Sequence, residues 1–163
     1  MSYTASVITV SDLGSRGLRQ DTSGPAVRAM LEDAGFTVVH TAIVPDERGQ
    51  ISALLRACAD ERKIDLILTT GGTGFTPRDQ TPEATLAVAD RTAPGIAEAI
   101  RADSMKYTKR AMFSRGVSVI RGKTLIINLP GSPKAVHESM EVFLDELPHA
   151  LDMLRNTVHD CAR

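Results

Sequence analysis

A short glycine-rich stretch followed by charged residues is the part of this sequence best suited to chemistry. Gly71, Gly72 and Gly74 come directly after an apolar run, and Arg78 and Asp79 follow within a few residues. Glycine lets a backbone approach a ligand closely, and successive peptide N–H groups in such a turn can hold an anion. Arginine can meet a phosphate with paired donors, and aspartate can hold a metal ion or accept a proton. The loop therefore predicts a binding site for an anion; the alternative is a tight turn in which Asp79 bonds its own backbone.

Three further loops have a similar composition. Each of the four follows an expected strand and combines glycine or proline with serine, threonine or aspartate, over residues 11–24, 45–49, 71–80 and 130–133. In open α/β sheets, ligands bind outside the carboxyl ends of the strands. If the strands are parallel, the first three loops share one rim of the sheet, and we expect the site there.

The elements that must position these loops alternate along the chain. Short β-branched and apolar runs predict strands over residues 3–10, 36–44 and 64–70. Apolar residues at helical spacing predict helices from Pro25 to Gly35 and over 51–58. Two shorter helices are expected near Pro82, with Thr81 as the cap, and near Pro94. This alternation predicts a largely parallel sheet covered on both faces.

The last third of the chain adds a hairpin and a helix. Residues 117–121 and 124–129 are expected to form a hairpin that turns at Gly122-Lys123 in a type II′ turn. A final helix is expected from Pro133 to Leu154, with a kink at Pro148. We predict one α/β domain over residues 1–163.

Composition narrows the class of protein. Hydrophobic residues make up 42% and charged residues 24% of 163 residues, as in an ordinary globular domain. The net charge is −1, but the segment from Arg101 to Lys123 carries seven bases and one acid. This basic segment predicts an anionic ligand or an acidic neighbouring subunit; a solvated face is the alternative. Its two aromatic residues, Tyr107 and Phe113, are few for stacking bases, so we expect no binding of nucleic acid.

Cysteine usage and hydropathy indicate a cytoplasmic protein. Cys58 and Cys161 belong to no metal-ligand or CxxC pattern, and Cys58 falls on an apolar helix face where a buried thiol is expected. Such unpaired thiols fit a reducing cytosol. No apolar run approaches the length of a membrane span, so we expect no membrane contact.

Several familiar signatures are absent. No GxGxxG motif follows a strand, and five residues separate Gly116 from Gly122-Lys123 where a Walker A loop has four. Ser132 lies in PGSP, not in GxSxG, so it is expected to cap a helix and not to act as a nucleophile. The four histidines show no zinc-ligand spacing. Asp46, in VPDE, either caps the second helix or belongs to the site.

The order of several short motifs resembles one known family. TTGGTG followed by PRDQTPEAT, together with VSD, DTSGP, VPDE, SRG and LIINLPGSPKAV, resembles the MogA/MoaB group of molybdopterin-binding proteins over nearly the whole chain. The resemblance implies a three-layer α/β/α domain that assembles as a homotrimer. The MogA-like branch transfers an adenylyl group from ATP to molybdopterin with Mg²⁺, and the MoaB-like branch includes proteins of less certain activity. We favour the adenylyltransferase, with a MoaB-like carrier or scaffold as the alternative.

The resemblance also implies which residues act. Asp46 and Asp79 match the functional acids of the family, as catalytic residues and as the groups that hold Mg²⁺. Either acid can instead bond the pterin. The ligand-binding residues implied by the matched motifs are Ser11, Asp12, Gly71, Gly72, Thr73, Gly74, Arg78, Glu83, Ser114, Arg115, Pro130, Gly131 and Ser132. Hand-over of the product to a molybdate-inserting, MoeA-like protein is expected to follow.

Overall fold

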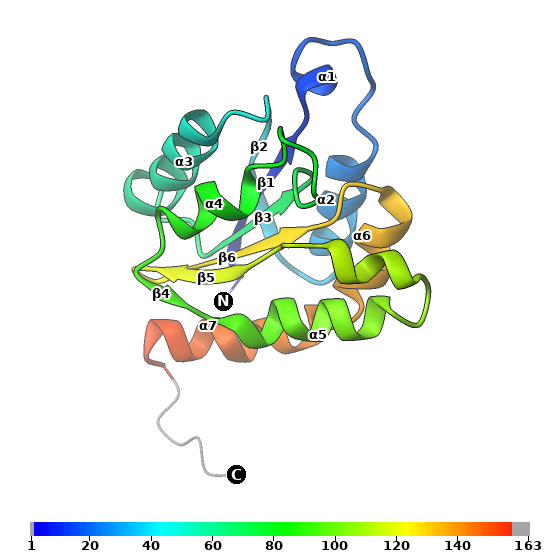
Figure 1. Cartoon of the computed structure of the whole chain (residues 1–163). Coiled ribbons are helices and arrows are strands. Elements are labelled where there is room, and N and C mark those ends of the chain that lie inside the picture. Colours follow the sequence, from blue (N-terminus) through cyan, green and yellow to red (C-terminus); the bar gives the residue numbers. More distant parts are fainter. Residues whose placement is uncertain (1, 158–163) are drawn as a thin grey trace.

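The computed structural model describes residues 2–157, which form a six-stranded sheet between two layers of helices (Figure 1). The strands lie in the order β2-β1-β3-β6-β5-β4. The first four of these run parallel, whereas β5 pairs antiparallel with both β6 and β4. The predicted, mostly parallel sheet with an added hairpin is therefore confirmed. The strands are β1 Thr4–Val10, β2 Thr37–Val44, β3 Leu66–Thr70, β4 Arg91–Thr92, β5 Ser118–Arg121 and β6 Thr124–Leu129.

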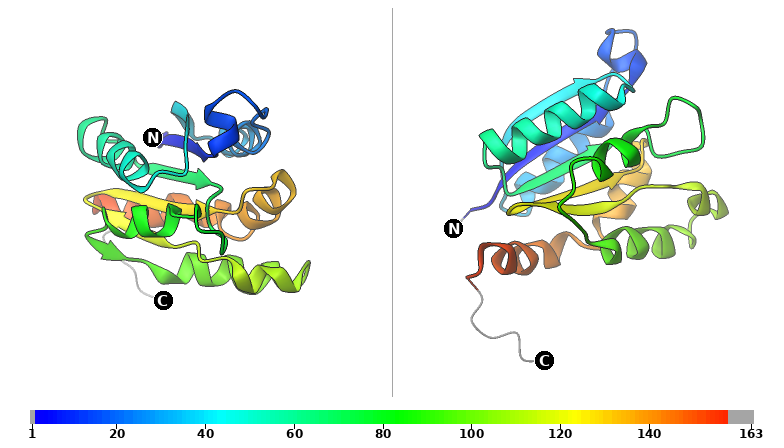
Figure 2. Two further views of the ribbon diagram at one scale, coloured as in Figure 1. Left: turned by 45° about the horizontal axis from the view of Figure 1, so that its top comes forward. Right: turned by 60° about the vertical axis from the view of Figure 1, so that its left-hand side comes forward.

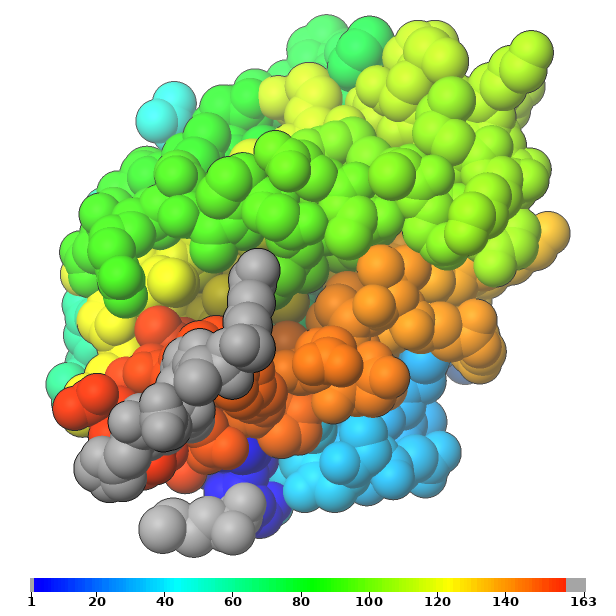
Figure 3. Space-filling view, turned by 90° about the horizontal axis from the view of Figure 1, so that it is seen from below, coloured from blue at the N-terminus to red at the C-terminus, as the bar shows by residue number. Residues whose placement is uncertain are grey.

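Helices cover both faces of the sheet, as the three-layer architecture requires (Figure 2). One layer contains α2 Ser23–Asp33, α5 Pro94–Ser104, α6 Pro133–Met140 and α7 Leu147–Arg155. Figure 3 shows α5, in green, alongside α6 and α7, in orange and red, on this face. The other layer contains α3 Arg48–Arg56, the π-helix Ala57–Glu61 and α4 Thr81–Leu86. None of the helices within residues 2–157 combines the length and the apolar character needed to span a bilayer.

Two hydrophobic cores follow from the alternation of side chains along the strands. In β1, Ala5 and Val7 belong to the core under α2 and α6, whereas Ile8 and Val10 belong to the core under α3. In β6, Ile127 and Ile126 divide in the same way. Successive strand residues point to opposite faces, and a sheet covered on both sides buries both sets. Cys58 is buried in the second core, as expected; Cys161 lies outside the described residues.

The parallel strands bring four loops to one edge of the sheet. The chain runs from β1 outward to β2 and then returns past β1 to β3, so the strand order reverses between β1 and β3. Such a reversal opens a crevice at the carboxyl ends of the strands. The fourth predicted loop, residues 130–133, joins the other three because β6 is parallel to β3.

Two expectations about the last third of the chain have different outcomes. The hairpin forms as predicted, and Gly122 adopts a φ of 56°, which the first central residue of a type II′ turn requires. The single kinked helix predicted from Pro133 is wrong, because α6 ends at Met140 and α7 begins at Leu147. Pro148 falls in the first turn of α7, where its missing N–H has no cost, so it starts a new helix and does not kink an old one.

Candidate functional site

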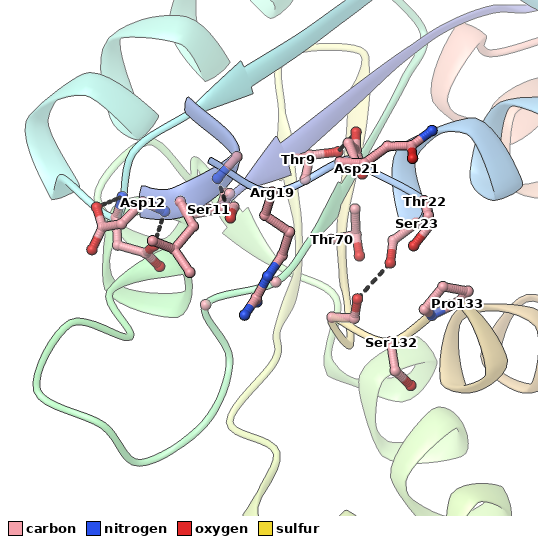
Figure 4. A pocket seen from close by; sticks show the side chains of 18 of the residues that line it. Thr9, Ser11, Asp12, Arg19, Asp21, Thr22, Ser23, Thr70, Ser132 and Pro133 are labelled. Carbon is pink, nitrogen blue, oxygen red and sulfur yellow. Dashed lines mark hydrogen bonds between the residues drawn. The ribbon is translucent and has the colours of Figure 1, made fainter. Parts of the chain in front are cut away.

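An open cavity of about 590 Å³ lies at the carboxyl ends of the parallel strands (Figure 4). All four predicted loops contribute to its wall, so the structure confirms the rim inferred from the sequence. Residues that line the cavity come from 9–14, 19–23, 70–72 and 131–133, together with Asp46 and Asp79.

The glycine loop owes its path to two residues in the left-handed region. Gly71 and Gly72 have φ values of 95° and 70°. A Cβ atom on Gly71 would lie 2.4 Å from the Val10 carbonyl oxygen, and one on Gly72 would lie 2.2 Å from Thr81 Oγ1. A Cβ on Gly72 would also stand 3.1 Å from Asp46 Oδ1. Only glycine therefore permits this close approach of the loop to β1 and to Asp46.

Thr81 fastens the glycine loop instead of capping α4. Gln80 occupies the N-cap position, so the prediction of Thr81 as the cap is wrong. The Thr81 hydroxyl donates to the Gly71 carbonyl oxygen at 2.9 Å, and the Thr81 amide donates to the Gly72 carbonyl oxygen at 3.2 Å. The start of α4 thus holds both glycines in place.

Asp46 lies at the cavity with its carboxylate fixed by backbone. Its Oδ2 atom accepts a hydrogen bond from the Asp12 amide at 2.9 Å. Burial raises the pKa of Asp46, and the charges of Asp12 and Asp79 raise it further, although the bond from the Asp12 amide acts in the opposite direction. Glu47, not Asp46, is the N-cap residue of α3, so the alternative reading of Asp46 as a helix cap is wrong. A cation at this place would relieve the repulsion between the carboxylates.

Asp79 fits both interpretations that the sequence left open, a residue of a tight turn and a ligand-binding residue. Its Oδ2 atom accepts from the Thr76 amide at 2.9 Å, and its own amide donates to the Thr76 carbonyl oxygen at 3.0 Å. Asp79 is therefore part of a tight turn. It also lines the cavity, and its Oδ1 atom makes no hydrogen bond within residues 2–157. One oxygen serves the turn and the other is free for a ligand.

Arg78 ties three loops of the rim together. Its guanidinium donates to both carboxylate oxygens of Asp12, at 3.0 and 2.9 Å, and to Glu47 Oε1 at 2.8 Å. The hydrogen bonds from Arg78, followed by the bond with Asp46, hold the pKa of Asp12 below its usual range. Arg78 does not line the cavity. Its predicted contact with a phosphate stays a prediction.

Arg115 and Glu83 support the glycine loop from behind. Arg115 donates to the carbonyl oxygens of Gly74 and Asp79, at 2.8 Å each, and pairs with Glu83. Burial raises the pKa of Glu83, but the hydrogen bond from Arg115, a backbone hydrogen bond and the charges of Arg115 and Arg48 together outweigh it, so the pKa is lowered. Several predicted site residues thus lie outside the main cavity, namely Thr73, Gly74, Arg78, Glu83, Ser114, Arg115 and Pro130. Of these, Thr73, Gly74, Ser114 and Pro130 line a second, smaller cavity.

The basic segment is largely used for internal contacts. Arg101 donates to the Gly116 carbonyl oxygen, Arg121 pairs with Asp60, and Lys106 pairs with Asp103. Together with Arg115, four of the seven bases therefore hold neighbouring parts of the fold. Lys109 and Arg110 form no ion pair within the described part of the chain.

The predicted site omitted the residues around the start of α2. Asp21 Oδ1 accepts from the Gly24 amide at 3.0 Å, and Asp21 Oδ2 accepts from Thr9 Oγ1 at 2.7 Å. Ser23 donates to the Gly131 carbonyl oxygen, which joins two loops of the cavity wall. The sequence predicts that the loop 11–24 lies on this rim, but only the fold shows that Asp21 and Ser23 of its DTSG stretch line the cavity. The other cavity residues that the prediction missed are Val10, Leu13, Gly14, Arg19, Gln20, Thr22, Thr70 and Pro133.

The carboxylates of the cavity fit Mg²⁺ held jointly with a ligand. Within residues 2–157, no three histidine, cysteine or acidic side chains lie close enough together to hold a metal ion by themselves. Mg²⁺ is commonly bound through one or two carboxylates and completed by substrate phosphates. Asp46 and Asp79 supply two carboxylates at one cavity, so the donor set suits that arrangement and not an all-protein cage.

Comparisons with known proteins agree with this geometry. Residues 6–149 match the family described as "Probable molybdopterin binding domain". The chain is 46% identical over 142 residues to a molybdopterin adenylyltransferase of Haemophilus influenzae, covering 86% of this chain and 72% of that protein. It is 44% identical over 158 residues to the molybdenum cofactor synthesis protein cinnamon of Drosophila melanogaster, covering 96% of this chain but only 26% of that longer protein. A crystal structure of the molybdopterin biosynthesis enzyme MoaB from Thermus thermophilus superposes with a TM-score of 0.89 at 49% identity, covering 94% and 97% of the two chains.

The fold and the cavity define an α/β protein with a loop-lined cavity at the carboxyl edge of a parallel sheet. The chain belongs to the molybdopterin-binding family, and the resemblance drawn from its motifs is confirmed.

Proposed function

We propose that this protein is a molybdopterin adenylyltransferase of molybdenum cofactor biosynthesis. It transfers the adenylyl group of ATP to the terminal phosphate of molybdopterin and releases pyrophosphate. The observation that carries the proposal is the placement of Asp46 and Asp79. They come from separate loops, line the same cavity beside Gly71 and Gly72, and keep acceptor capacity for a ligand.

The reaction needs positioning more than it needs a base. An oxygen of the molybdopterin phosphate bonds to the α-phosphorus of ATP, the bond from that phosphorus to the bridging oxygen breaks, and the electron pair leaves with pyrophosphate. The attacking oxygen already carries negative charge, so no strong base is required. The difficulty is to bring two polyanions together, and fixed donors and charges lower that barrier.

The residues of the chain divide this work. The backbone of the glycine loop offers close approach to a phosphate. Mg²⁺, when bound, neutralises phosphate charge in the transition state, and Asp46 and Asp79 are the residues that would hold it. The reciprocal bonds between the loops of Asp12 and Asp46 keep that carboxylate in place while substrates bind.

Incubation with molybdopterin, ATP and Mg²⁺ tests the proposal. Mass detection of adenylylated molybdopterin, with release of an equal amount of pyrophosphate, is the expected result. The alternative is a carrier that binds molybdopterin without transfer, and the similarity to a protein titled MoaB keeps it open. A carrier would bind molybdopterin tightly and form no adenylylated product after many times the incubation needed by an active relative.

We further propose that the protein acts in the cytoplasm as a homotrimer and passes its product to a MoeA-like protein. The resemblance supports the trimer. Large apolar side chains also stand exposed near the glycine loop, including Phe75, Met112 and Phe113. The rings of Phe75 and Phe113 lie 5.3 Å apart between centroids. Light scattering at micromolar concentration checks the assembly, and a monomer mass would contradict it.

A further inference from the structure

One basic side chain reaches the main cavity. Arg19 is the only lysine or arginine among the residues that line it in the described part of the chain. Figure 4 shows its side chain extending into the middle of the cavity, between Ser11 and Asp12 on one side and Thr22, Ser23 and Ser132 on the other. Arg19 is exposed and forms no ion pair with another residue of 2–157. Its guanidinium is therefore free for a ligand.

The cavity wall is negatively charged, so binding of an anionic ligand requires a free cationic side chain such as Arg19. Four carboxylates line the cavity, those of Asp12, Asp21, Asp46 and Asp79. Asp12 is neutralised by Arg78, and Asp21 accepts bonds from Thr9 and Gly24, but the remaining two carry no cationic partner. A triphosphate and a phosphorylated pterin would add several more negative charges. A metal ion can compensate at the acids, but the opposite wall needs its own positive charge.

That opposite wall is suited to phosphate. It contains the hydroxyl groups of Thr22, Ser23 and Ser132, and both α2 and α6 begin there. The positive end of each helix dipole favours an anion there, and the Gly24 and Ala135 amides are already bonded to Asp21 Oδ1 and Ser132 Oγ. Ser132 already caps α6 through the Ala135 amide at 3.2 Å. Arg19 extends between this wall and the acidic one (Figure 4), where a bound polyphosphate would be in reach.

We propose that Arg19 binds the β- and γ-phosphates of ATP and stabilises the pyrophosphate as it leaves. This assignment rests on the proposed function. As the bond between the α-phosphorus and the bridging oxygen breaks, negative charge grows on the departing β-phosphate. The planar guanidinium of Arg19 donates two parallel hydrogen bonds to that charge. The acidic wall is left for the metal ion, and the α-phosphate is held between the two walls.

The test compares Arg19→Ala and Arg19→Lys with Arg16→Ala as the matched control. Arg16 is exposed on the same loop but does not line the cavity. Titration calorimetry with inorganic pyrophosphate and Mg²⁺ measures the contact without any turnover. Arg19→Ala is expected to weaken pyrophosphate binding by about tenfold to a hundredfold, the effect of losing a charge-assisted contact. The pyrophosphate affinity of Arg19→Lys is expected to lie between those of Arg19→Ala and the unaltered protein. The affinity of Arg16→Ala is expected to match that of the unaltered protein.

A second measurement separates phosphate from pterin. In the transfer assay, Arg19→Ala should lower kcat/KM for ATP and weaken inhibition by pyrophosphate, with the KM for molybdopterin unchanged. Equal pyrophosphate affinity in Arg19→Ala and the unaltered protein would overturn the inference, as would a loss confined to molybdopterin. If the unaltered protein forms no adenylylated product but Arg19→Ala still loses pyrophosphate affinity, the proposed function fails and the assignment of Arg19 stands.

Discussion

Asp12 and Asp46 hold each other through their main chains. The Asp46 amide donates to Asp12 Oδ1 at 3.0 Å, and the Asp12 amide donates to Asp46 Oδ2 at 2.9 Å. This reciprocal pair joins the loop after β1 to the loop after β2 without any cation between the two carboxylates. Two like charges are thus kept close together by backbone donors, an arrangement that a divalent ion would stabilise. The pair fixes the Asp46 carboxylate relative to the loop after β1.

Replacement of Asp79 by asparagine should separate its role in the turn from its role in chemistry. Asparagine keeps an acceptor for the Thr76 amide, so the loop should fold normally. The lost charge is worth about 1.5–3 kcal/mol in a charge-assisted contact, which corresponds to a roughly tenfold to hundredfold lower rate of adenylyl transfer. The measurement is turnover at saturating ATP and Mg²⁺. Unchanged turnover would make Asp79 a structural residue only.

Asp90→Asn is the control for that experiment. Asp90 Oδ2 accepts from the Gly122 amide at 2.7 Å in the hairpin region, far from the cavity. The same substitution there removes the same charge from a similar turn. Transfer activity should stay intact, and only a small change in melting temperature is expected.

Gly72→Ala should weaken nucleotide binding as well as stability. The added Cβ would meet Thr81 Oγ1 at 2.2 Å and Asp46 Oδ1 at 3.1 Å, so the loop or the carboxylate must move. Gly35→Ala is the matched control, because Gly35 has a φ of 88° but open space around it. Both variants should lose about 1 kcal/mol or more of stability from backbone strain. An equal affinity for ATP in the two variants, measured by calorimetry, would refute the role assigned to Gly72.

Asp65→Asn should destabilise the fold without changing catalysis. Asp65 accepts from Arg155 at 3.1 and 2.7 Å and from the Thr4 amide at 2.9 Å, which joins α7 to the start of β1. Burial raises the pKa of Asp65, but the hydrogen bonds from Arg155 and Thr4 outweigh it, so the pKa is lowered. The contribution is therefore present above the unfolded pKa near 4 and is lost as pH falls through the folded pKa. Urea unfolding at pH 7 should show a loss of about 2 kcal/mol, whereas Asp33→Asn, on an exposed helix end, should show almost none.

His40 should make stability fall in mildly acidic solution. Burial, followed by the charge of Arg62, lowers the pKa of His40, whose Nδ1 atom lies 2.8 Å from Ser6 Oγ. The folded state thus favours the neutral ring. The unfolded chain binds the proton more readily, so stability declines as pH drops below the unfolded pKa of about 6.5 and keeps declining until the folded pKa is passed. Melting temperatures between pH 8 and 5 should fall less steeply for His40→Asn than for the unaltered protein; parallel curves would contradict this.

Reversal of two exposed bases tests the basic segment. Lys109 and Arg110 are exposed and form no ion pair within the described residues, so their change to glutamate leaves the ion pairs of the segment intact. If the segment meets an acidic neighbouring subunit, the double variant should shift the mass measured by light scattering toward the monomer. An unchanged mass together with unchanged ligand binding would leave a solvated face as the explanation.

The sequence was enough to predict which loops form the rim of the cavity. It was not enough to predict which side chains point into the cavity. The parallel strands were predictable because β-branched runs alternate with helical spacing, and the convergence of the loops follows from that topology alone. Whether Arg78 or Arg19 enters the cavity does not follow, since both stand on polar loops near acids. The fold decides it through the contacts of Arg78 with Asp12 and Glu47.

Helix boundaries near the C-terminus show a different limit. Apolar spacing from Pro133 onward fits one helix, and the same residues serve two helices because Met140, Phe143, Leu147 and Leu151 all pack into one core. The spacing of apolar residues indicates which side of a helix is buried, but it does not indicate where one helix ends and the next begins. The predicted role of Thr81 was wrong for a related reason. A threonine before proline suits a helix cap, but the Thr81 hydroxyl donates instead to the Gly71 carbonyl oxygen, ten residues earlier in the chain.

The strand order of the sheet, with its reversal between β1 and β3, determines when the cavity can form while the chain is being synthesised. The wall of the cavity requires residues near positions 12, 46, 72 and 131, so no amino-terminal fragment that ends before β6 can complete it. Ligand affinity therefore appears only when almost the whole domain has emerged and closed. Conversely, a bound ligand stabilises the domain as one unit by mass action, so protection from proteolysis should extend to β6 as strongly as to the glycine loop.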